Sequence, residues 1–346
     1  GQPATERPMS RRRFLKAAAT IGMTALTLGP SAAGAQQAAP LSATARPIRI
    51  RMGGYGPATT GFSRGLKHIG DRLEANFGAE LSVQYLYNVM DLGYAGGDLR
   101  WLVDTGVLTV GYVSMSDIPE LELASLPFLF PDTATARAAM DGPLGRAAAA
   151  RLEAQNNYRI LGYFENGFRH ISNSVRPVHT LEDLRGLRIR VRGAAQARTF
   201  ERLGADPQIV GLAAAVEGIR NGTLDGQENP FINTITYDIY PHQRFFTATF
   251  HSYLSRPIFV HAPSFDAWPA AVRDRVRTAA REAVTLQRDL HDDEEEQAQA
   301  IIREAGGEIV QLTPAAREAF VAAVAPIYAE ARRRYPRELL AMVGLG

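Results

Sequence analysis

Three arginines at alternate positions of one apolar segment are the side chains of this sequence best suited to hold an anion. The segment runs Leu187, Arg188, Ile189, Arg190, Val191, Arg192. If it is a strand, the arginines share one side and the apolar residues share the other. Such a row commonly forms a solvated sheet face. Alternatively, the central Arg190 points into a cleft, where its planar guanidinium could hold a carboxylate by two parallel hydrogen bonds.

A second cation could come from Arg169, two residues after Gly167 in a turn between predicted strands. Residue composition alone does not choose between a solvated face and a binding site for either arginine. Both interpretations therefore stay open at this point.

A serine motif typical of hydrolases also occurs, but its surroundings do not favour catalysis. The sequence GFSRG at 61–65 matches the G-x-S-x-G pattern between a predicted strand and a predicted helix. An enzyme of that class needs an upstream loop for its oxyanion hole, and few residues of the exported chain precede this motif. The segment is more simply the start of a helix beside a ligand-facing loop.

The histidine and acidic residues of the sequence do not form a pattern typical of a metal site, and its composition provides no reactive thiolate. The sequence has no cysteine, which excludes zinc–thiolate sites, cysteine nucleophiles and iron–sulfur clusters. The run HDDEEE at 291–296 would point around a helix rather than toward one ion. Five histidines form no close i, i+4 pair and no H-E-x-x-H motif: His170, His179, His242, His251 and His261. We therefore predict no catalytic residue, no metal site and no cofactor.

Residues 1–35 have the features of an export signal. The twin-arginine sequence SRRRFLK at 10–16 precedes a mildly apolar stretch, 17–28, and the small-x-small pattern AGA at 33–35. The stretch is too short and too weakly apolar to span a bilayer as a helix. We expect a twin-arginine signal peptide, and export of a chain beginning at Gln36 to the periplasm.

Removing this leader changes the charge balance. The full chain has 38 Lys and Arg against 36 Asp and Glu, and five basic residues and one acidic residue fall in 1–35, which leaves 33 against 35. No basic cluster with interleaved aromatic residues remains, so we predict no nucleic-acid partner. No later segment has the roughly 20 apolar residues of a membrane span, so we predict no stable membrane insertion. We also expect a monomer.

The first part of the exported chain predicts an α/β fold. Strands are expected at 48–52, 81–87 and 107–113, with helices at 62–77 and around 99–103. This alternation is typical of a mainly parallel sheet flanked by helices, which binds ligands at the carboxyl ends of its strands. By that position, Thr60, Tyr112 and Ser114 are candidates to contact a ligand, and Phe231 is a fourth because of its loop.

Further strands and one very long helix are predicted in the rest of the chain. Strands are expected at 158–164 and 168–173, separated by a turn, then at 187–191, 245–250 and 258–261. Apolar residues then recur at steps of three and four along 268–304. At ~1.5 Å per residue that helix would be roughly 50 Å long, so we expect it to be a spine across two lobes. A final helix is predicted over 314–335.

Four blocks of sequence occur in an order that resembles one family of binding proteins. The blocks are GYFENGFRH at 162–170, TLEDLRGLRIRV at 180–191, LGADP at 203–207 and DGQENP at 225–230; LPFLF at 126–130 also fits. Together they resemble the DctP-type solute-binding proteins of TRAP (tripartite ATP-independent periplasmic) transporters. The resemblance covers essentially the whole exported chain.

This resemblance implies a fold and a mode of binding. The implied fold is the two-lobed periplasmic-binding-protein-like fold, which holds a small carboxylate-bearing organic acid between its lobes and delivers it to TRAP membrane subunits. Arg190 would form the salt bridge to the carboxylate, and Arg169 and Asn229 would contact the ligand. Two departures bear on which acid is bound. Arg192 stands where the family usually has Pro, and AAAV at 213–216 replaces its usual helix start.

The expected lobes and the competing functions complete the prediction. Lobe I would comprise 46–166 with 255–294, and lobe II 167–254 with 295–346. A periplasmic hydrolase or isomerase acting on an organic acid could use His170 or Glu228 as a base, but no nucleophile is paired with an oriented base. We therefore predict that the protein is not an enzyme. A ligand sensor for a signalling receptor would share the same binding chemistry.

Overall fold

The computed structural model describes residues 46–346, so the predicted signal peptide lies outside the described residues. The described chain forms two compact units. The first comprises 46–113, 152–164 and 256–290, and the second comprises 114–151, 165–255 and 291–346. Residues 114–151 pack with the second unit, whereas the predicted division assigned them to lobe I.

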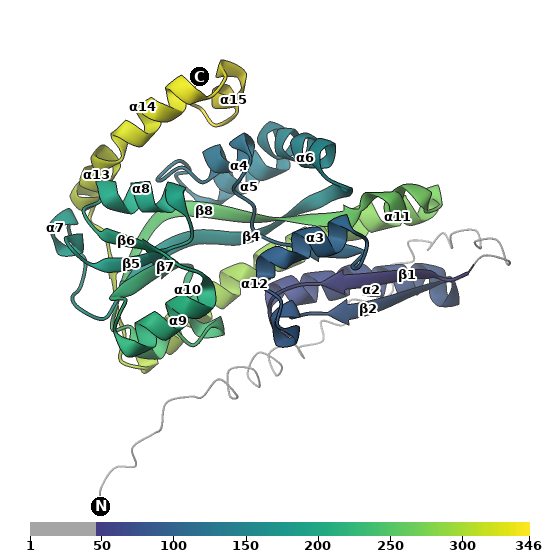
Figure 1. Ribbon diagram of the computed structural model, residues 1–346, viewed down its shortest axis with the longest axis horizontal. Coiled ribbons are helices and arrows are strands. Elements are labelled where there is room, and N and C mark those ends of the chain that lie inside the picture. Colours follow the sequence, from purple (N-terminus) through teal and green to yellow (C-terminus); the bar gives the residue numbers. More distant parts are fainter. Residues whose placement is uncertain (1–45) are drawn as a thin grey trace, which may run out of the picture. The chain divides into compact units, whose positions relative to one another are not determined.

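The first unit is built on parallel strands (Figure 1). β1 (Ile48–Gly53) pairs in parallel with β2 (Leu81–Leu86) and β3 (Val110–Tyr112), and β3 pairs antiparallel with the end of β8 (Phe245–His261). Alternation along β1 buries Ile50 and Met52 against the core. α2 (Gly61–Phe77) packs there through Leu66, Ile69 and Leu73. The helical elements η1 (Gly78–Glu80), η2 (Val89–Leu92), η3 (Gly96–Asp98), α3 (Leu99–Asp104) and α11 (Ala262–Ala267) complete this unit.

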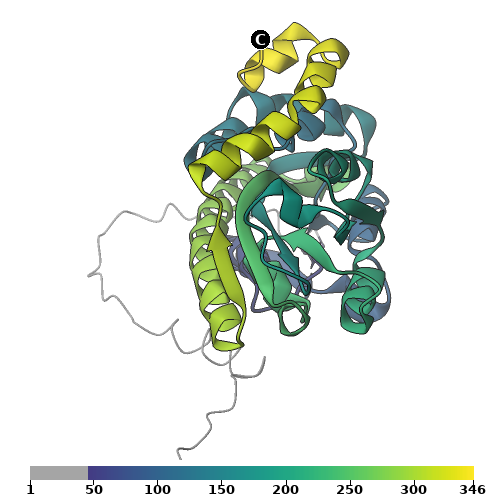
Figure 2. The ribbon, with the colours of Figure 1, turned by 90° about the vertical axis from the view of Figure 1, so that its left-hand side faces the viewer.

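The second unit contains a further set of paired strands. β5 (Arg188–Val191) lies between β6 (Asp206–Ile209) and β7 (Gly226–Asn229), parallel to both, and β7 pairs antiparallel with the end of β4 (Tyr158–Asn173). β9 (Glu308–Gln311) runs parallel to the start of β8, as Figure 2 shows. The pairing places the ends of β5 and β7 next to each other, and Arg190 pairs in register with Gln227.

Short helices fill the rest of the second unit. They are α4 (Pro119–Ala124), α5 (Thr133–Asp141), α6 (Pro143–Gln155, ending in the first unit), α7 (Leu181–Leu184), α8 (Ala194–Arg202), α9 (Leu212–Asn221), α10 (Phe231–Thr236), η4 (Tyr240–His242), α13 (Pro314–Ala323), α14 (Ala325–Arg334) and α15 (Arg337–Met342). The predicted final helix over 314–335 is therefore two helices, α13 and α14, and α15 follows beyond the predicted end. Pro326, near the start of α14, lacks the N–H that a continuous helix would use.

The long helix and the fold class are confirmed. α12 spans Ala270–Glu304, with residues 270–290 in the first unit and 291–304 in the second. Among the strands of residues 46–346, the pairs β1–β2, β1–β3, β5–β6, β5–β7 and β8–β9 are parallel, and they form the majority of the pairings, as a mainly parallel α/β fold requires. No helix within residues 46–346 is long and apolar enough to cross a membrane.

Two predicted pairs of strands are in fact single long strands. β4 runs without interruption from Tyr158 to Asn173, through the Glu165–Gly167 turn that the sequence predicted. Glu165 and Asn166 are each 1% exposed, and Gly167 takes a φ of 86° that glycine adopts without strain. The polar residues of this segment are thus buried within a strand. In the same way, β8 is one strand that joins the predicted strands 245–250 and 258–261.

Candidate functional site

β5 buries the central arginine of the predicted anion-binding row. Arg190 is 7% exposed, and its Nε donates a hydrogen bond to the Val210 carbonyl oxygen at 2.9 Å. Arg188 is more exposed, and its Nη2 lies 2.8 Å from Oδ1 of Asp225. The interpretation as a solvated sheet face therefore holds for Arg188 but not for Arg190.

The surroundings of Arg190 favour an added negative charge. Burial lowers the pKa of Arg190, and the nearby positive charge of Arg169 lowers it further, while Glu228 and Tyr237 act in the opposite direction. The guanidinium still stays protonated, because the ordinary pKa of arginine lies far above neutral pH. A buried charge is costly unless an opposite charge accompanies it. An anion beside Arg190 would therefore be stabilised.

Arg169, the second predicted cation, is held by residues of its own unit. Its Nε lies 2.6 Å from Oε2 of Glu228, its Nη2 donates to the Glu228 carbonyl oxygen at 2.7 Å, and its Nη1 donates to Oδ1 of Asn166 at 3.1 Å. The side chain is 2% exposed. A ligand that binds Arg169 would have to share or replace these contacts.

Glu228 joins Arg169 to a histidine in a buried ionic network. His251 Nε2 lies 3.0 Å from Oε2 of Glu228, and His251 Nδ1 lies 2.6 Å from Oγ1 of Thr249. Burial acts to raise the pKa of Glu228, but the charge of Arg169 and the hydrogen bond and charge of His251 outweigh it and lower the pKa to about 2. Glu228 is therefore a carboxylate at neutral pH, already engaged by two partners.

Asn229 is oriented by a chain of buried amides. Its Nδ2 donates to Oε1 of Gln227 at 2.6 Å, and its Oδ1 accepts from Nδ2 of Asn233 at 3.2 Å. Gln227 in turn donates to Oγ of Ser172 at 2.7 Å. Since β7 pairs with β5, this chain lies on the strand next to Arg190. The arrangement can present a fixed amide beside a cation.

Phe231 follows Asn229 closely and packs against a neutral histidine. The rings of Phe231 and His170 stack with centroids 4.3 Å apart, and Phe250 meets His170 edge-on at 4.5 Å. Burial lowers the pKa of His170 well below its ordinary value, and the charges of His251, His291 and Arg169 act in the same direction. His170 is thus enclosed by aromatic rings, and Glu228 is bound to Arg169 and His251. Neither is presented as a free catalytic base.

The remaining predicted residues belong to two different units. Tyr112 lies in the first unit, 0% exposed, with its ring stacked on Phe62 at 5.2 Å. Thr60, also in the first unit, accepts a hydrogen bond from the Ser63 amide at 3.1 Å and caps α2. Ser114 is the first residue of the second unit. Within the second unit, the structure brings Arg169, Arg190, Asn229 and Phe231 onto adjoining strands and the start of α10.

The structure gives no catalytic role to the serine of the G-x-S-x-G motif and no metal site among the described residues. Ser63 is fully buried, and its Oγ donates to the Gly56 carbonyl oxygen at 3.2 Å, so it is not displayed as a nucleophile. Across residues 46–346, no group of three or more His, Cys, Asp and Glu side chains could hold a metal ion. His251 was missed as a member of the ionic network, because nothing in its local sequence marks it. Glu228 had a signal, since it lies inside the DGQENP block.

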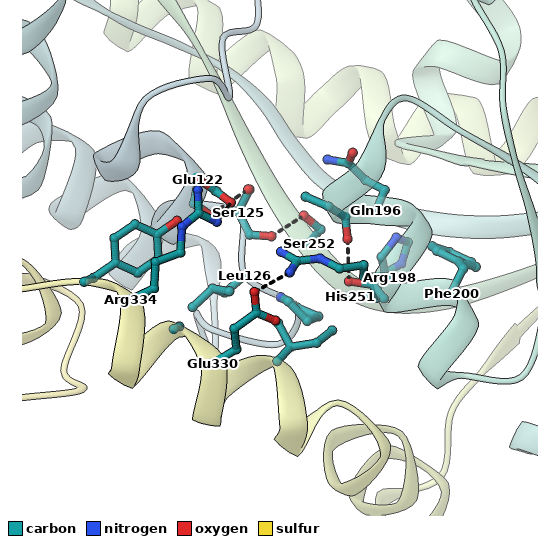
Figure 3. Close-up of a pocket in the computed structure, with 16 residues that line it drawn as sticks. Glu122, Ser125, Leu126, Gln196, Arg198, Phe200, His251, Ser252, Glu330 and Arg334 are labelled. Atoms are coloured by element: carbon teal, nitrogen blue, oxygen red, sulfur yellow. Dashed lines mark hydrogen bonds and ion pairs between the residues drawn. The ribbon is translucent and has the colours of Figure 1, made fainter.

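A pocket that includes His251 of the ionic network opens in the second unit between α4, α8, β8 and α14 (Figure 3). Two ion pairs line it: Arg198 Nη1 with Oε1 of Glu330 at 2.6 Å, and Arg334 Nη1 with Oε1 of Glu122 at 2.8 Å. Because each arginine already has a carboxylate partner, the pocket suits an anion less well than the surroundings of Arg190. None of the predicted ligand-contacting residues lines it.

Comparison with known proteins gives one family match. Residues 65–334 match the model of the bacterial extracellular solute-binding proteins of family 7, named DctP. Among curated relatives, a solute-binding protein of Verminephrobacter eiseniae is 32% identical over 227 residues, 65% of this chain and 67% of its own length. The 2,3-diketo-L-gulonate-binding periplasmic protein YiaO of Escherichia coli is 32% identical over 203 residues, 58% of this chain and 61% of its own length.

Solved structures show the same fold. The sugar acid binding protein DctPAm of Advenella mimigardefordensis, in complex with galactonate, has a TM-score of 0.79 at 26% identity, covering 86% of this chain and 97% of its own. A TRAP periplasmic solute binding protein of Polaromonas, bound to D-erythronate, has a TM-score of 0.78 at 25% identity, covering 86% and 98%. This chain therefore has the fold of these solute-binding proteins, which is the two-lobed fold expected from the sequence.

Proposed function

Because this chain belongs to the DctP family of bacterial extracellular solute-binding proteins, we propose that it is the periplasmic binding subunit of a TRAP transporter for a small hydroxylated organic acid. The family consists of binding proteins rather than enzymes. In this proposal the twin-arginine signal exports the chain, and TRAP membrane subunits receive the bound acid.

Arg190 carries this proposal. Its guanidinium is buried beside a second cation, and within the described part of the chain its hydrogen bond goes to a backbone carbonyl rather than to a carboxylate. A ligand carboxylate would supply the missing charge through the two-bond geometry that arginine favours. Arg169 and Asn229 would hold the same ligand, with Phe231, Tyr112, Ser114 and Thr60 in contact with it.

Three relatives support a narrower class of acid. The names of YiaO, DctPAm and the Polaromonas protein specify 2,3-diketo-L-gulonate, galactonate and D-erythronate, which are all sugar acids. The buried amides of Gln227, Asn229 and Asn233 are suited to hydroxyl groups, since an amide both donates and accepts hydrogen bonds. We therefore propose a sugar acid as the ligand.

A thermal-shift screen tests the proposal. Galactonate, D-erythronate and succinate should each be compared with galactose, which has hydroxyl groups but no carboxylate. A bound acid at about 100 times its Kd stabilises the fold by about 2.7 kcal/mol, which shifts the melting temperature by several degrees. Galactose should give no shift, and recovery of unchanged acid would separate binding from turnover. A shift with galactose and none with any acid in the screen would contradict the proposal.

A further inference from the structure

The long helix α12 provides an acidic cap for the segment that carries Asn229 and Phe231. Oε2 of Glu295 accepts a hydrogen bond from the Phe231 amide at 3.1 Å, and Oε1 accepts from the Ile232 amide at 2.8 Å. Phe231 and Ile232 are the first two residues of α10. One side chain of α12 therefore uses both of its oxygens to hold the start of a helix about 60 residues earlier in the chain.

α10 needs a partner of this kind. The first N–H groups of a helix have no acceptor within the helix, and a side chain at the cap usually supplies one. The cap residue here is Pro230, which makes no side-chain hydrogen bond. Glu295 takes over that role, and its negative charge suits the positive end of the helix. Asn229 lies immediately before this junction, so the position of its amide depends on the same contacts.

The charge of Glu295 is finely balanced. The residue is partly buried, and burial raises its pKa to about 8, against the Ile232 and Phe231 amides, which act to lower it. The charged groups that bear on it are Glu294 of the same helix and Glu165 of β4, both of which raise it further. Glu165 is itself bound by Arg137 of α5, whose Nε lies 3.0 Å from Oε1, and by the Tyr253 hydroxyl of β8 at 2.8 Å.

We propose that Glu295 is a positioning residue for ligand binding: its carboxylate fixes the junction between β7 and α10 to α12, and so holds Asn229 and Phe231 where the ligand needs them. The inference rests on the proposed function, but Glu295 itself does not touch the ligand. A carboxylate accepts both amides, whereas a protonated carboxyl group loses one acceptor. Ligand affinity should therefore rise as Glu295 ionises.

Folding stability should change in the opposite direction. The pKa of Glu295 in the fold lies above its ordinary value of 4.5. The stability that this group contributes is thus present at pH below about 4.5 and is lost as the pH rises through about 8. The same ionisation that tightens the ligand site costs folding free energy. A residue with only a structural role would not combine these two opposite effects.

The test compares Glu295→Gln with Glu296→Gln, which removes the same charge from an exposed position next along the helix. Calorimetric titration with galactonate is carried out at pH 6.5 and pH 9, together with thermal unfolding. Wild type and Glu296→Gln should bind about tenfold more tightly at pH 9, which corresponds to about 1.4 kcal/mol. Glu295→Gln should keep the weaker affinity at both values and should unfold at a higher temperature than wild type at pH 9.

The outcomes separate this inference from the proposed function. If Glu295→Gln bound galactonate with the affinity and the pH dependence of the wild type, the positioning role alone would be overturned. A lower unfolding temperature for Glu295→Gln at pH 9, together with weaker binding, would reduce Glu295 to a structural residue and also overturn it. If wild type bound neither galactonate nor any other organic acid, the proposed function would fail and the inference with it.

Discussion

At the scale of the residue, two neighbouring arginines have different electrostatic surroundings. Arg169 donates to both the side chain and the backbone of Glu228, so its charge is balanced within the protein. Arg190 makes its hydrogen bond to the neutral carbonyl group of Val210. Charge balance therefore assigns Arg169 first to a structural network and leaves Arg190 as the stronger candidate for a ligand carboxylate.

Replacing Arg190 should show this difference in ligand affinity. Arg190→Ala should weaken binding of the acid by at least about thirtyfold, because losing the partner of a buried charge costs about 2–5 kcal/mol. Arg190→Lys should also bind poorly, since an ammonium group lacks the two-bond fork. Titration calorimetry measures both.

The control is Arg188→Ala, which removes an arginine two positions away on the same strand from a more exposed ion pair with Asp225. It should bind within about fivefold of wild type, since exposed ion pairs contribute at most about 1 kcal/mol. Binding by Arg190→Ala at wild-type strength would refute the anchoring role.

At the scale of the element, β4 positions the network by remaining one strand. Its middle residues Glu165, Asn166 and Arg169 face partners inside the second unit, which a surface turn would have exposed to water. Gly167 permits this continuity. Its φ is 86°, and a Cβ at this position would collide with the ring of His291 on α12. Close packing of the strand against the long helix thus depends on glycine.

Gly167→Ala should therefore destabilise the fold for two reasons, backbone strain and collision with His291. Gly186→Ala is the matched control, because Gly186 has a φ of 71° but no atom within 4 Å of an added Cβ. We expect the control to lose about 1 kcal/mol from strain alone and Gly167→Ala to lose about 2–4 kcal/mol through added overpacking. If chemical denaturation gave equal losses in the free energy of unfolding for both variants, the His291 side chain would move aside without cost.

At the scale of the whole molecule, the chain passes between the two units five times, after residues 113, 151, 164, 255 and 290. Four of these crossings fall inside regular elements, namely α6, β4, β8 and α12. Strands and helices bend smoothly rather than fold sharply. We therefore propose that the lobes close by distributed bending of these elements, with α12 bending rather than breaking.

Small-angle scattering measures the proposed closure. A ligand that contacts both lobes binds the closed state more tightly, and this difference in affinity drives the change. Saturation with a sugar acid should reduce the radius of gyration of the wild type, while Arg190→Ala at the same concentration should keep the unbound value. An unchanged radius in protein that calorimetry shows to be saturated would favour a preformed pocket.

Local patterns in the sequence determined much of this protein. The steps of three and four along α12 and the alternation around Arg190 involve residues that are neighbours in the chain, so helix and strand could be predicted from them. The ordered blocks also identified the family that the comparison then showed. Helix and strand periods repeat every few residues, so a short stretch of sequence is enough to display them.

Only the tertiary structure decided which of these residues meet. Asp225 pairs with Arg188 and not with Arg190, and Glu228 binds Arg169 from 59 positions away. Glu295 reaches α10 from 64 positions away. The polar residues Glu165 and Asn166 are typical of a turn in the sequence, yet they are buried, because they have hydrogen-bonding partners within the fold. Each of these pairings depends on how distant segments pack together, and no local pattern in the sequence records that.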